Sequence, residues 1–286
     1  MAGANVWGGR TLSVDRAVIE RFLGDLRTLE TFPDTPAAAR ILDAFAAVPR
    51  ERFTGPGPWT LLSFERGEMR RERTPDADPR HLYRPVLVAL DEAQGINIGD
   101  PTLWAPLLAR LDVSEGARVA QVGAGSGYYT AILAELVGTE GCVEAWEIED
   151  ALIAMAREAL ADRPNVALHD ANAATLEGGA GPFDLVVSFA GVTHPALAWC
   201  EALAPSGRML LPVTGSGGRG AMCLFTREGD GFSIDTWGPC GFYPCHGARD
   251  PHVEYAIDAL FADRSLLQDA RLRGAWEDGR FAYAVA

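Results

Sequence analysis

Lysine is absent from the 286-residue sequence, so that all 25 basic side chains are arginines. Without lysine the chain forms no Schiff base with pyridoxal phosphate, and it has neither a phosphate-binding G-K-[ST] loop nor a lysine general base. The 39 acidic residues outnumber the basic ones, so the formal net charge is −14. Such a chain repels phosphate backbones, and we therefore expect no nucleic acid among its partners.

Cysteine and long apolar runs are scarce as well. The five cysteines are odd in number and scattered, which argues against a disulfide framework. Cys240, Cys245 and His246 have no second ligand pair at zinc spacing, so we expect no metal. The longest apolar runs are far shorter than the roughly 20 residues of a membrane span, and residues 1–16 lack a secretory signal pattern. These features predict a cytoplasmic protein without membrane contact.

The sequence divides into three segments of different character. Residues 1–112 predict auxiliary helices and substrate-side loops. Within them, Thr35-Pro36 is typical of a helix start, and the proline- and glycine-rich stretch from Phe53 to Arg80 predicts a long irregular connection or lid. We expect residues 113–250 to form the core. We expect residues 251–286 to form a helical extension that either packs on the core or mediates a homodimer. The oligomeric state stays open.

From residue 118 onward, apolar runs and helical segments alternate, which is typical of strands connected by helices in a parallel sheet. After residue 215, two apolar segments on either side of Gly229-Asp230-Gly231 predict an antiparallel hairpin. We therefore predict an α/β fold: a doubly wound, mostly parallel seven-stranded sheet with a C-terminal antiparallel hairpin and extra N-terminal helices. The expected parallel strands are 118–122, 142–147, 165–169, 183–190 and 207–213.

A glycine-rich loop, residues 123–127, follows the first of these strands. Glycines at alternate positions let the backbone pass close to a ligand, because a Cβ atom there would collide with it. The dinucleotide fingerprint G-x-G-x-x-G would require a glycine at the position of Tyr128. The spacing G-x-G-x-G favours S-adenosylmethionine (SAM), which has no phosphates to hold. The predicted SAM-binding residues of this loop are Gly123, Gly125, Ser126, Gly127 and Tyr128.

Two acidic residues end the next two strands. Glu147 lies about 20 residues after the loop, where a carboxylate can accept hydrogen bonds from both ribose hydroxyls. Asp170 ends the third strand, where it can accept from the adenine amine. Either acid can instead be a helix N-cap or a solvent contact. A nicotinamide-dependent dehydrogenase would use the same strand-end acid, but the missing glycine at Tyr128 and the terminal hairpin count against that alternative.

Further motifs resemble the protein-L-isoaspartate O-methyltransferase family. The segment Val48–Phe53 matches the V-P-R-E-x-F motif of this family, and Gly123–Tyr128 matches its G-x-G-S-G-Y motif. Leu211–Val213 and Gly241–Pro244 resemble its fifth and last strands. The resemblance covers roughly residues 35–250. It implies a Rossmann-like SAM methyltransferase fold, with SAM as cofactor and an aspartyl or isoaspartyl carboxylate of a protein or peptide as methyl acceptor.

Departures from the family pattern bear on the acceptor. The family loop T-I-S-x-P appears here as Asn97 to Pro101, so that Gly99 replaces the serine associated with the substrate carboxylate. Gln121 replaces the acid that the family places on the first strand. After the fourth strand, Ala190 is predicted to contact the cofactor, and His194 places a titratable imidazole at the mouth of the crevice. The predicted catalytic residues are Asn97, Gly99 and His194.

The methyl acceptor decides whether a general base is needed. A carboxylate already has an available lone pair, whereas a hydroxyl or amine would need a base such as His194. His194 can equally be a helix N-terminal residue next to Pro195. Three functional classes remain open: carboxyl O-methylation of a protein or peptide, O- or N-methylation of a small molecule or natural-product peptide, and a non-catalytic SAM-binding adaptor. Gly99 and Gln121 motivate the third class.

Overall fold

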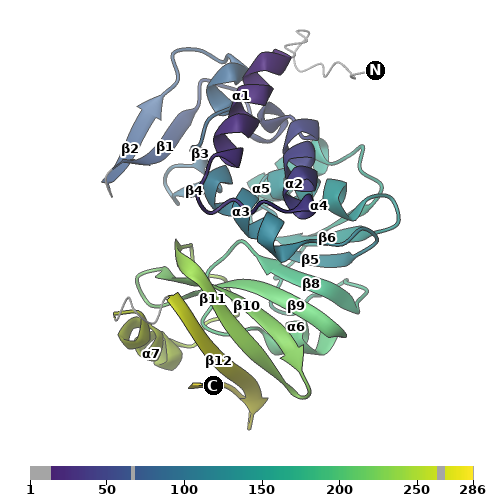
Figure 1. Ribbon diagram of the computed structural model, residues 1–286, viewed down its shortest axis with the longest axis vertical. Coiled ribbons are helices and arrows are strands. Elements are labelled where there is room, and N and C mark those ends of the chain that lie inside the picture. The colour runs from purple at the N-terminus through teal and green to yellow at the C-terminus, as the bar shows by residue number, and fades with distance from the viewer. Residues whose placement is uncertain (1–13, 66–67, 263–267, 286) are drawn as a thin grey trace. The chain divides into compact units, whose positions relative to one another are not determined.

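The computed structural model describes residues 14–65, 68–262 and 268–285 (Figure 1). Across these residues, none of the helices has both the length and the apolar character that a membrane crossing requires. The chain divides into two compact units. Unit 1 comprises Met1–Ser114 and Gly125–Leu136, and unit 2 comprises Glu115–Ala124 and Val137–Ala286.

Two helices of unit 1 begin where the sequence provides both a cap and a proline. The Thr35 hydroxyl accepts a hydrogen bond from an amide of the following turn at 3.3 Å, and Pro36 occupies the first helical position, where no amide donor is needed. Asp100 caps the helix that starts at Pro101 in the same way, at 2.8 Å. The helices of this unit are α1 (Arg16–Arg27), α2 (Pro36–Ala47), α3 (Pro101–Leu111) and most of α4 (Tyr128–Val137), with two 3₁₀ helices, η1 (Arg50–Phe53) and η2 (Pro79–Leu82).

Unit 1 also contains a small antiparallel sheet. Its four strands are β1 (Thr60–Glu65), β2 (Glu68–Arg73), β3 (Leu87–Asp91) and β4 (Ile96–Ile98), in the order β2-β1-β3-β4. The prediction of an irregular connection from Phe53 to Arg80 was therefore wrong for β1 and β2. All six residues of β2 are exposed, so the strand has no buried face. Its sequence therefore lacks the alternation of apolar and polar residues that would predict a strand. The strand forms because its backbone pairs with β1, with Phe64 opposite Met69.

Arg50 is a fully buried cation in unit 1, with 0% of its surface exposed. Its Nη1 donates to the carbonyls of Leu82 and Arg84 at 2.6 and 3.0 Å, and its Nη2 donates to the carbonyl of Val86 at 2.6 Å. The guanidinium carbon also lies 5.6 Å from the centroid of the Tyr128 ring. A single side chain therefore connects η1 to the segment between η2 and β3 and satisfies its buried carbonyl groups.

Unit 2 is built on one mixed sheet. Its nine strands are β5 (Arg118–Val122), β6 (Cys142–Glu147), β7 (Val166–Asp170), β8 (Phe183–Ser188), β9 (Leu203–Thr214), β10 (Arg219–Glu228), β11 (Gly231–Gly241), β12 (Gln268–Glu277) and β13 (Arg280–Val285). They lie in the order β13-β12-β11-β10-β9-β8-β5-β6-β7. Figure 1 labels the strands from β12 to β6 in this order. The pairs from β7 to β9 are parallel, and the pairs from β9 to β13 are antiparallel. The helices of this unit are α5 (Asp150–Ala159), α6 (Leu197–Ala202) and α7 (Pro251–Ala262).

The predicted doubly wound α/β class is confirmed, but the sheet has nine strands rather than seven. The hairpin predicted around Gly229-Asp230-Gly231 is present as β10 and β11. The segment 251–286, predicted as a helical extension, contains α7 followed by β12 and β13. These two strands add Leu272 and Phe281 to the apolar core of unit 2. β12 pairs with β11, from which α7 separates it in the sequence, and β13 pairs with β12, so local periodicity alone does not reveal them. The three-segment domain division remains a prediction.

Two fully buried tryptophans occupy the core of unit 2. Trp146 on β6 donates its indole N–H to the carbonyl of Glu177 at 3.0 Å, and Trp199 on α6 donates to the carbonyl of Ala173 at 2.7 Å. Both rings are therefore buried without leaving a polar atom unsatisfied. The two acceptors lie in the connection after β7, which is thereby held against the sheet and against α6.

We expect the substitution Arg50→Leu to lower the free energy of unfolding by about 3 kcal/mol or more, because leucine leaves buried carbonyl groups without their donors. Equilibrium denaturation in urea, followed by tryptophan fluorescence, measures this change. Arg16→Leu is the control, since the Arg16 side chain is 92% exposed in its ion pair with Glu20. Its replacement should change the free energy by no more than ~0.5 kcal/mol. Equal effects of the two substitutions would contradict the role of Arg50.

Candidate functional site

Four neighbouring parallel strands of unit 2 end at one edge of the sheet. Val122 at the end of β5 pairs with Trp146 of β6 and Ser188 of β8, and Glu147 pairs with Asp170 at the end of β7. The residues that directly follow these strands are therefore neighbours in space. This is the edge at which doubly wound sheets bind ligands.

The glycine loop starts at this edge with a conformation that requires glycine. The φ angles of Gly123, Gly125 and Gly127 are 78°, 56° and 93°, in the left-handed region that side chains disfavour. A Cβ atom on Gly123 would lie 3.8 Å from the Cβ of Phe189, which follows β8. Apart from Gly125 itself and its two chain neighbours, no atom of the described residues lies within 4 Å of a Cβ built on Gly125. The loop thus leaves open space beside its backbone, as a closely held ligand requires.

Gln121 on β5 supplies a buried acceptor next to this loop. Its side chain is 0% exposed, and its Nε2 donates to the carbonyl of Gly123 at 3.4 Å. Within the described part of the chain, its Oε1 has no hydrogen-bond partner. A buried amide oxygen without a donor is costly unless a ligand or water satisfies it. Gln121 therefore fits a ligand that presents a donor, such as the ammonium group of SAM.

Two buried hydroxyls lie at the start of α4 in unit 1. Ser126 is 2% exposed and Thr130 is 0% exposed, and the described residues offer neither hydroxyl a hydrogen-bond partner. Ser126 was predicted from the motif, whereas Thr130 was missed. Ser126 lies in the turn before α4, so the spacing of four residues is no helical signal, and the sequence alone does not single out Thr130.

Glu147 is oriented by the turn that follows it. Its carboxylate is 7% exposed, and Oε1 accepts hydrogen bonds from the amides of Ile148 and Glu149 at 2.8 and 3.1 Å. The carboxylate therefore shapes the connection between β6 and α5 and is held at the ligand edge by the same bonds. Ribose recognition by Glu147 remains a prediction.

Asp170 and Ala190 lie at the ends of β7 and β8. The side chain of Asp170 is 46% exposed and pairs with Arg157 of α5 at 3.2 Å. This pair competes with any contact to an adenine amine. The Ser188 hydroxyl donates to the carbonyl of Ala190 at 2.7 Å and contacts its amide at 3.2 Å. Ala190 is therefore held in a tight turn, half-buried at the edge.

Tyr128 was predicted as a cofactor residue, but its side chain belongs to the core of unit 1. It is 2% exposed, and its ring lies 6.2 Å from that of Phe45 and 5.7 Å from that of Phe53. Burial raises the pKa of Tyr128 to about 12, so the phenol is neutral at physiological pH. The Tyr128 ring thus packs in unit 1, and a contact of this residue with the cofactor remains a prediction.

The predicted catalytic residues Asn97 and Gly99 lie in unit 1, and neither offers a hydroxyl. Asn97 on β4 donates through Nδ2 to the carbonyl of Gly95 at 3.1 Å. The Gly99 carbonyl accepts a hydrogen bond from the Tyr129 hydroxyl at 2.8 Å. A Cβ atom on Gly99 would lie 2.7 Å from the Nε1 and 2.9 Å from the Cδ1 of Trp104. The Trp104 indole therefore fills the space that a side chain at position 99 would need.

The third predicted catalytic residue, His194, belongs to unit 2 and packs against the hairpin formed by β12 and β13. Its ring centroid lies 5.4 Å from that of Trp276 and 6.5 Å from that of Phe281, and its Nδ1 is 2.8 Å from the Thr193 hydroxyl. Burial lowers the pKa of His194, and the nearby carboxylate of Asp250 opposes this shift. These contacts favour a structural role for the imidazole.

Comparison with known families gives a match over most of the chain. The sequence model of the protein-L-isoaspartate(D-aspartate) O-methyltransferase family matches residues 34–249. A protein-L-isoaspartate O-methyltransferase of Anaeromyxobacter dehalogenans is 32% identical over 197 residues, which cover 67% of this chain and 81% of the relative. One of Methylorubrum extorquens is 33% identical over 220 residues, covering 74% and 84%.

Solved structures share the fold. One named protein-L-isoaspartate O-methyltransferase has a TM-score of 0.61 at 19% identity and covers 93% of this chain and 82% of its own. A Plasmodium falciparum protein, described as a putative enzyme of the same name in complex with S-adenosyl-L-homocysteine, has a TM-score of 0.59 at 17% identity, covering 80% and 98%. The motif resemblance over roughly residues 35–250 is thus confirmed, and the chain belongs to the protein-L-isoaspartate(D-aspartate) O-methyltransferase family.

Proposed function

We propose that this protein is a SAM-dependent methyltransferase that esterifies an aspartyl or isoaspartyl carboxylate in a protein or peptide. The glycine loop carries the proposal for the methyl donor, because it combines positive φ angles with open space beside Gly125. The related sequences, which are named for this activity, support the acceptor class. The net charge of −14 supports a protein or peptide acceptor over a nucleic acid.

Residues at the carboxyl ends of β5 to β7 would hold the donor. SAM, when bound, supplies a methyl group on a positively charged sulfur. The Oε1 atom of Gln121 would accept from the methionine ammonium, and this would satisfy an amide oxygen that is otherwise buried without a partner. Glu147 would accept from the ribose hydroxyls, and Asp170 from the adenine amine once it exchanges its pairing with Arg157.

The acceptor side needs positioning rather than proton transfer. An ionised carboxylate presents its lone pair directly, so the chain has to orient the acid and exclude water. Asn97 and the backbone amides around Gly99 would supply donors for this purpose. His194 is not required as a base, in agreement with its packing against Trp276 and Phe281.

A second candidate is O- or N-methylation of a small molecule or natural-product peptide on the same scaffold. The observation that favours it is the Trp104 indole, which fills the space beside Gly99 and excludes the hydroxyl that the family pattern places there. A non-catalytic SAM-binding adaptor is the third alternative. The same experiment separates all three.

We expect incubation with methyl-labelled SAM and an isoaspartyl peptide to produce a base-labile methyl ester on the peptide. Release of labelled methanol at alkaline pH measures it, and the same peptide with asparagine at that position is the control. Tight SAM binding without ester formation would support the small-molecule or adaptor alternatives. Calorimetry that detects no affinity for SAM or S-adenosylhomocysteine would refute the shared premise.

Glu147→Gln tests the predicted ribose contact. Glutamine keeps an oxygen for the amides of Ile148 and Glu149 and loses the negative charge. We expect SAM binding to weaken by about 1.5–3 kcal/mol, the usual contribution of hydrogen bonds to a charged group. Isothermal calorimetry measures the affinity. Glu158→Gln, an exposed residue on α5, is the control for the change in net charge. Unchanged affinity of Glu147→Gln would place the ribose elsewhere.

Gly99→Ser tests whether Trp104 excludes a side chain from the loop. We expect the substitution to lower the free energy of unfolding by about 1–3 kcal/mol, the usual cost of overpacking. In the double variant Gly99→Ser with Trp104→Val, the costs should not add, because valine makes room for the serine. A double-mutant cycle by urea denaturation measures the coupling. Additive effects would show that the two positions do not compete for space.

A further inference from the structure

The turn that follows β8, Gly191–His194, is held by residues far along the chain. The amide of Gly191 donates to the carbonyl of Tyr243 at 2.6 Å, and its carbonyl accepts from the amide of Cys245 at 2.7 Å. The amide and carbonyl of Val192 bond to backbone groups of β9 at 2.9 and 2.8 Å. The first two residues of the turn therefore have their backbone groups paired, which fixes their position.

Thr193 is bound more completely still. It is 0% exposed, and its amide donates to the carbonyl of Ala248 at 3.1 Å. Its hydroxyl accepts from the amide of Asp250 at 2.8 Å, and its carbonyl accepts from the hydroxyl of Tyr283 at 2.7 Å. Ala248, Asp250 and Tyr283 thus each form a hydrogen bond with Thr193.

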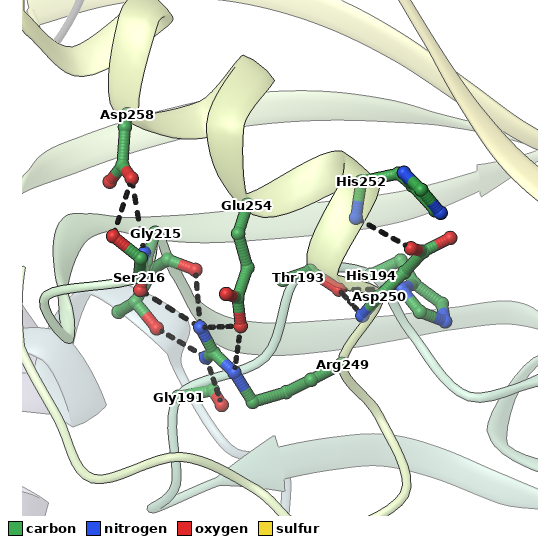
Figure 2. A network of polar contacts seen from close by, with 11 residues as sticks. Gly191, Thr193, His194, Gly215, Ser216, Arg249, Asp250, His252, Glu254 and Asp258 are labelled. Carbon is green, nitrogen blue, oxygen red and sulfur yellow. Dashed lines mark hydrogen bonds and ion pairs between the residues drawn. The ribbon is translucent and has the colours of Figure 1, made fainter.

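Arg249 joins the turn to α7 and to the end of β9 (Figure 2). Its Nη1 donates to the carbonyl of Gly191 and to the hydroxyl of Thr214, both at 2.9 Å. Its Nη2 donates to the carbonyl of Gly215 at 2.8 Å, and its Nε donates to the carboxylate of Glu254 at 2.8 Å. Only 14% of the side chain is exposed, so these bonds are shielded from water.

The hairpin formed by β12 and β13 covers the last residue of the turn, His194. Trp276 of β12 and Phe281 of β13 both pack against the ring of His194. The family match ends at residue 249, so α7, β12 and β13 lie beyond the matched region. Asp250, Trp276 and Tyr283 therefore hold the turn from beyond the matched region, and Tyr243, Cys245 and Arg249 hold it from within that region.

The position of the turn bears on the ligand edge. It begins three residues after β8, and Phe189 between them lies beside Gly123 of the glycine loop. The donor-side residues Gln121 and Glu147 belong to other strands and have their own hydrogen bonds. A shift of the turn would therefore reshape the wall beside a bound donor, while Gln121 and Glu147 keep their own hydrogen bonds.

We propose that Arg249, Asp250, α7 and the strands β12 and β13 form a clamp that positions the Gly191–His194 turn as a wall of the methyl-acceptor site. Arg249 and Tyr283 are its positioning residues, since they act through the turn and not on the reacting atoms. The acceptor part of this inference rests on the proposed function. The mechanical part, that these elements hold the turn in place, does not.

Tyr283→Phe removes only the hydroxyl that bonds the Thr193 carbonyl. We expect the KM for an isoaspartyl peptide to rise about two- to tenfold, as the loss of one hydrogen bond implies, while the Kd for SAM stays unchanged. A merely structural role would lower the active fraction, and with it kcat, without moving KM. Tyr255→Phe on α7, where the side chain is 80% exposed, is the matched control. An unchanged KM in Tyr283→Phe overturns the acceptor part.

Hydrogen exchange of the full chain tests the mechanical part without turnover. The amides of Val192 and Thr193 should exchange about fivefold faster in Tyr283→Phe than in the wild type, because local opening becomes easier. Those of β5 and β6 should not change. If the wild type methylates no isoaspartyl peptide, the proposed function fails and exchange alone decides the clamp. Equal exchange rates in the turn overturn it.

Two substitutions of Thr193 test whether its hydroxyl is needed to hold the turn. Thr193→Ser keeps the hydroxyl that accepts from the Asp250 amide, and it should retain the wild-type KM and exchange rates. Thr193→Val removes this acceptor at nearly the same volume, and it should reproduce the effect of Tyr283→Phe. Identical behaviour of the serine and valine variants would contradict the role of the hydroxyl in the clamp.

Discussion

The parallel pairing of β5 with β6 and β8 is the constraint on which the site depends. Parallel strands end at the same edge of a sheet, so this pairing brings together the start of the glycine loop, Glu147 and Ala190. The loop after β5 has positive φ angles at Gly123, Gly125 and Gly127, a conformation that residues with side chains disfavour. A donor held by backbone and by strand-end side chains is the natural use of such an edge.

Most polar groups at this edge already have partners within the protein, and this limits what they can do. Glu147 accepts from two backbone amides, and Asp170 is paired with Arg157. Gln121 differs, because its buried Oε1 has no partner among the described residues. Native proteins rarely leave such an atom unsatisfied, so Gln121 is the strongest sign of a ligand site at this edge. The acceptor side shows no comparable sign in the loop at Gly99, where a buried indole has replaced a side chain.

Carboxyl methylation tolerates such a loop better than other methyl transfers do. A carboxylate needs orientation and a dry site but no base, so the loss of a hydroxyl removes one donor and leaves the reaction possible. The demand for orientation falls instead on the rigid elements around the acceptor. We propose that the hydrogen-bonded turn after β8, held by Arg249 and Tyr283, is such an element.

The sequence by itself determined the α/β class, the strands that lead to the ligand edge, the glycine loop and the family, because apolar periodicity and glycine spacing are local properties. It did not reveal β2, β12 or β13: β2 and β13 pair with the strand just before each of them, and β12 pairs with the more distant β11. It also could not tell that Tyr128 is a core residue or that His194 packs against Trp276. Only the tertiary structure decided these roles, because the burial and the hydrogen-bond partners of a side chain are set by residues distant in the sequence.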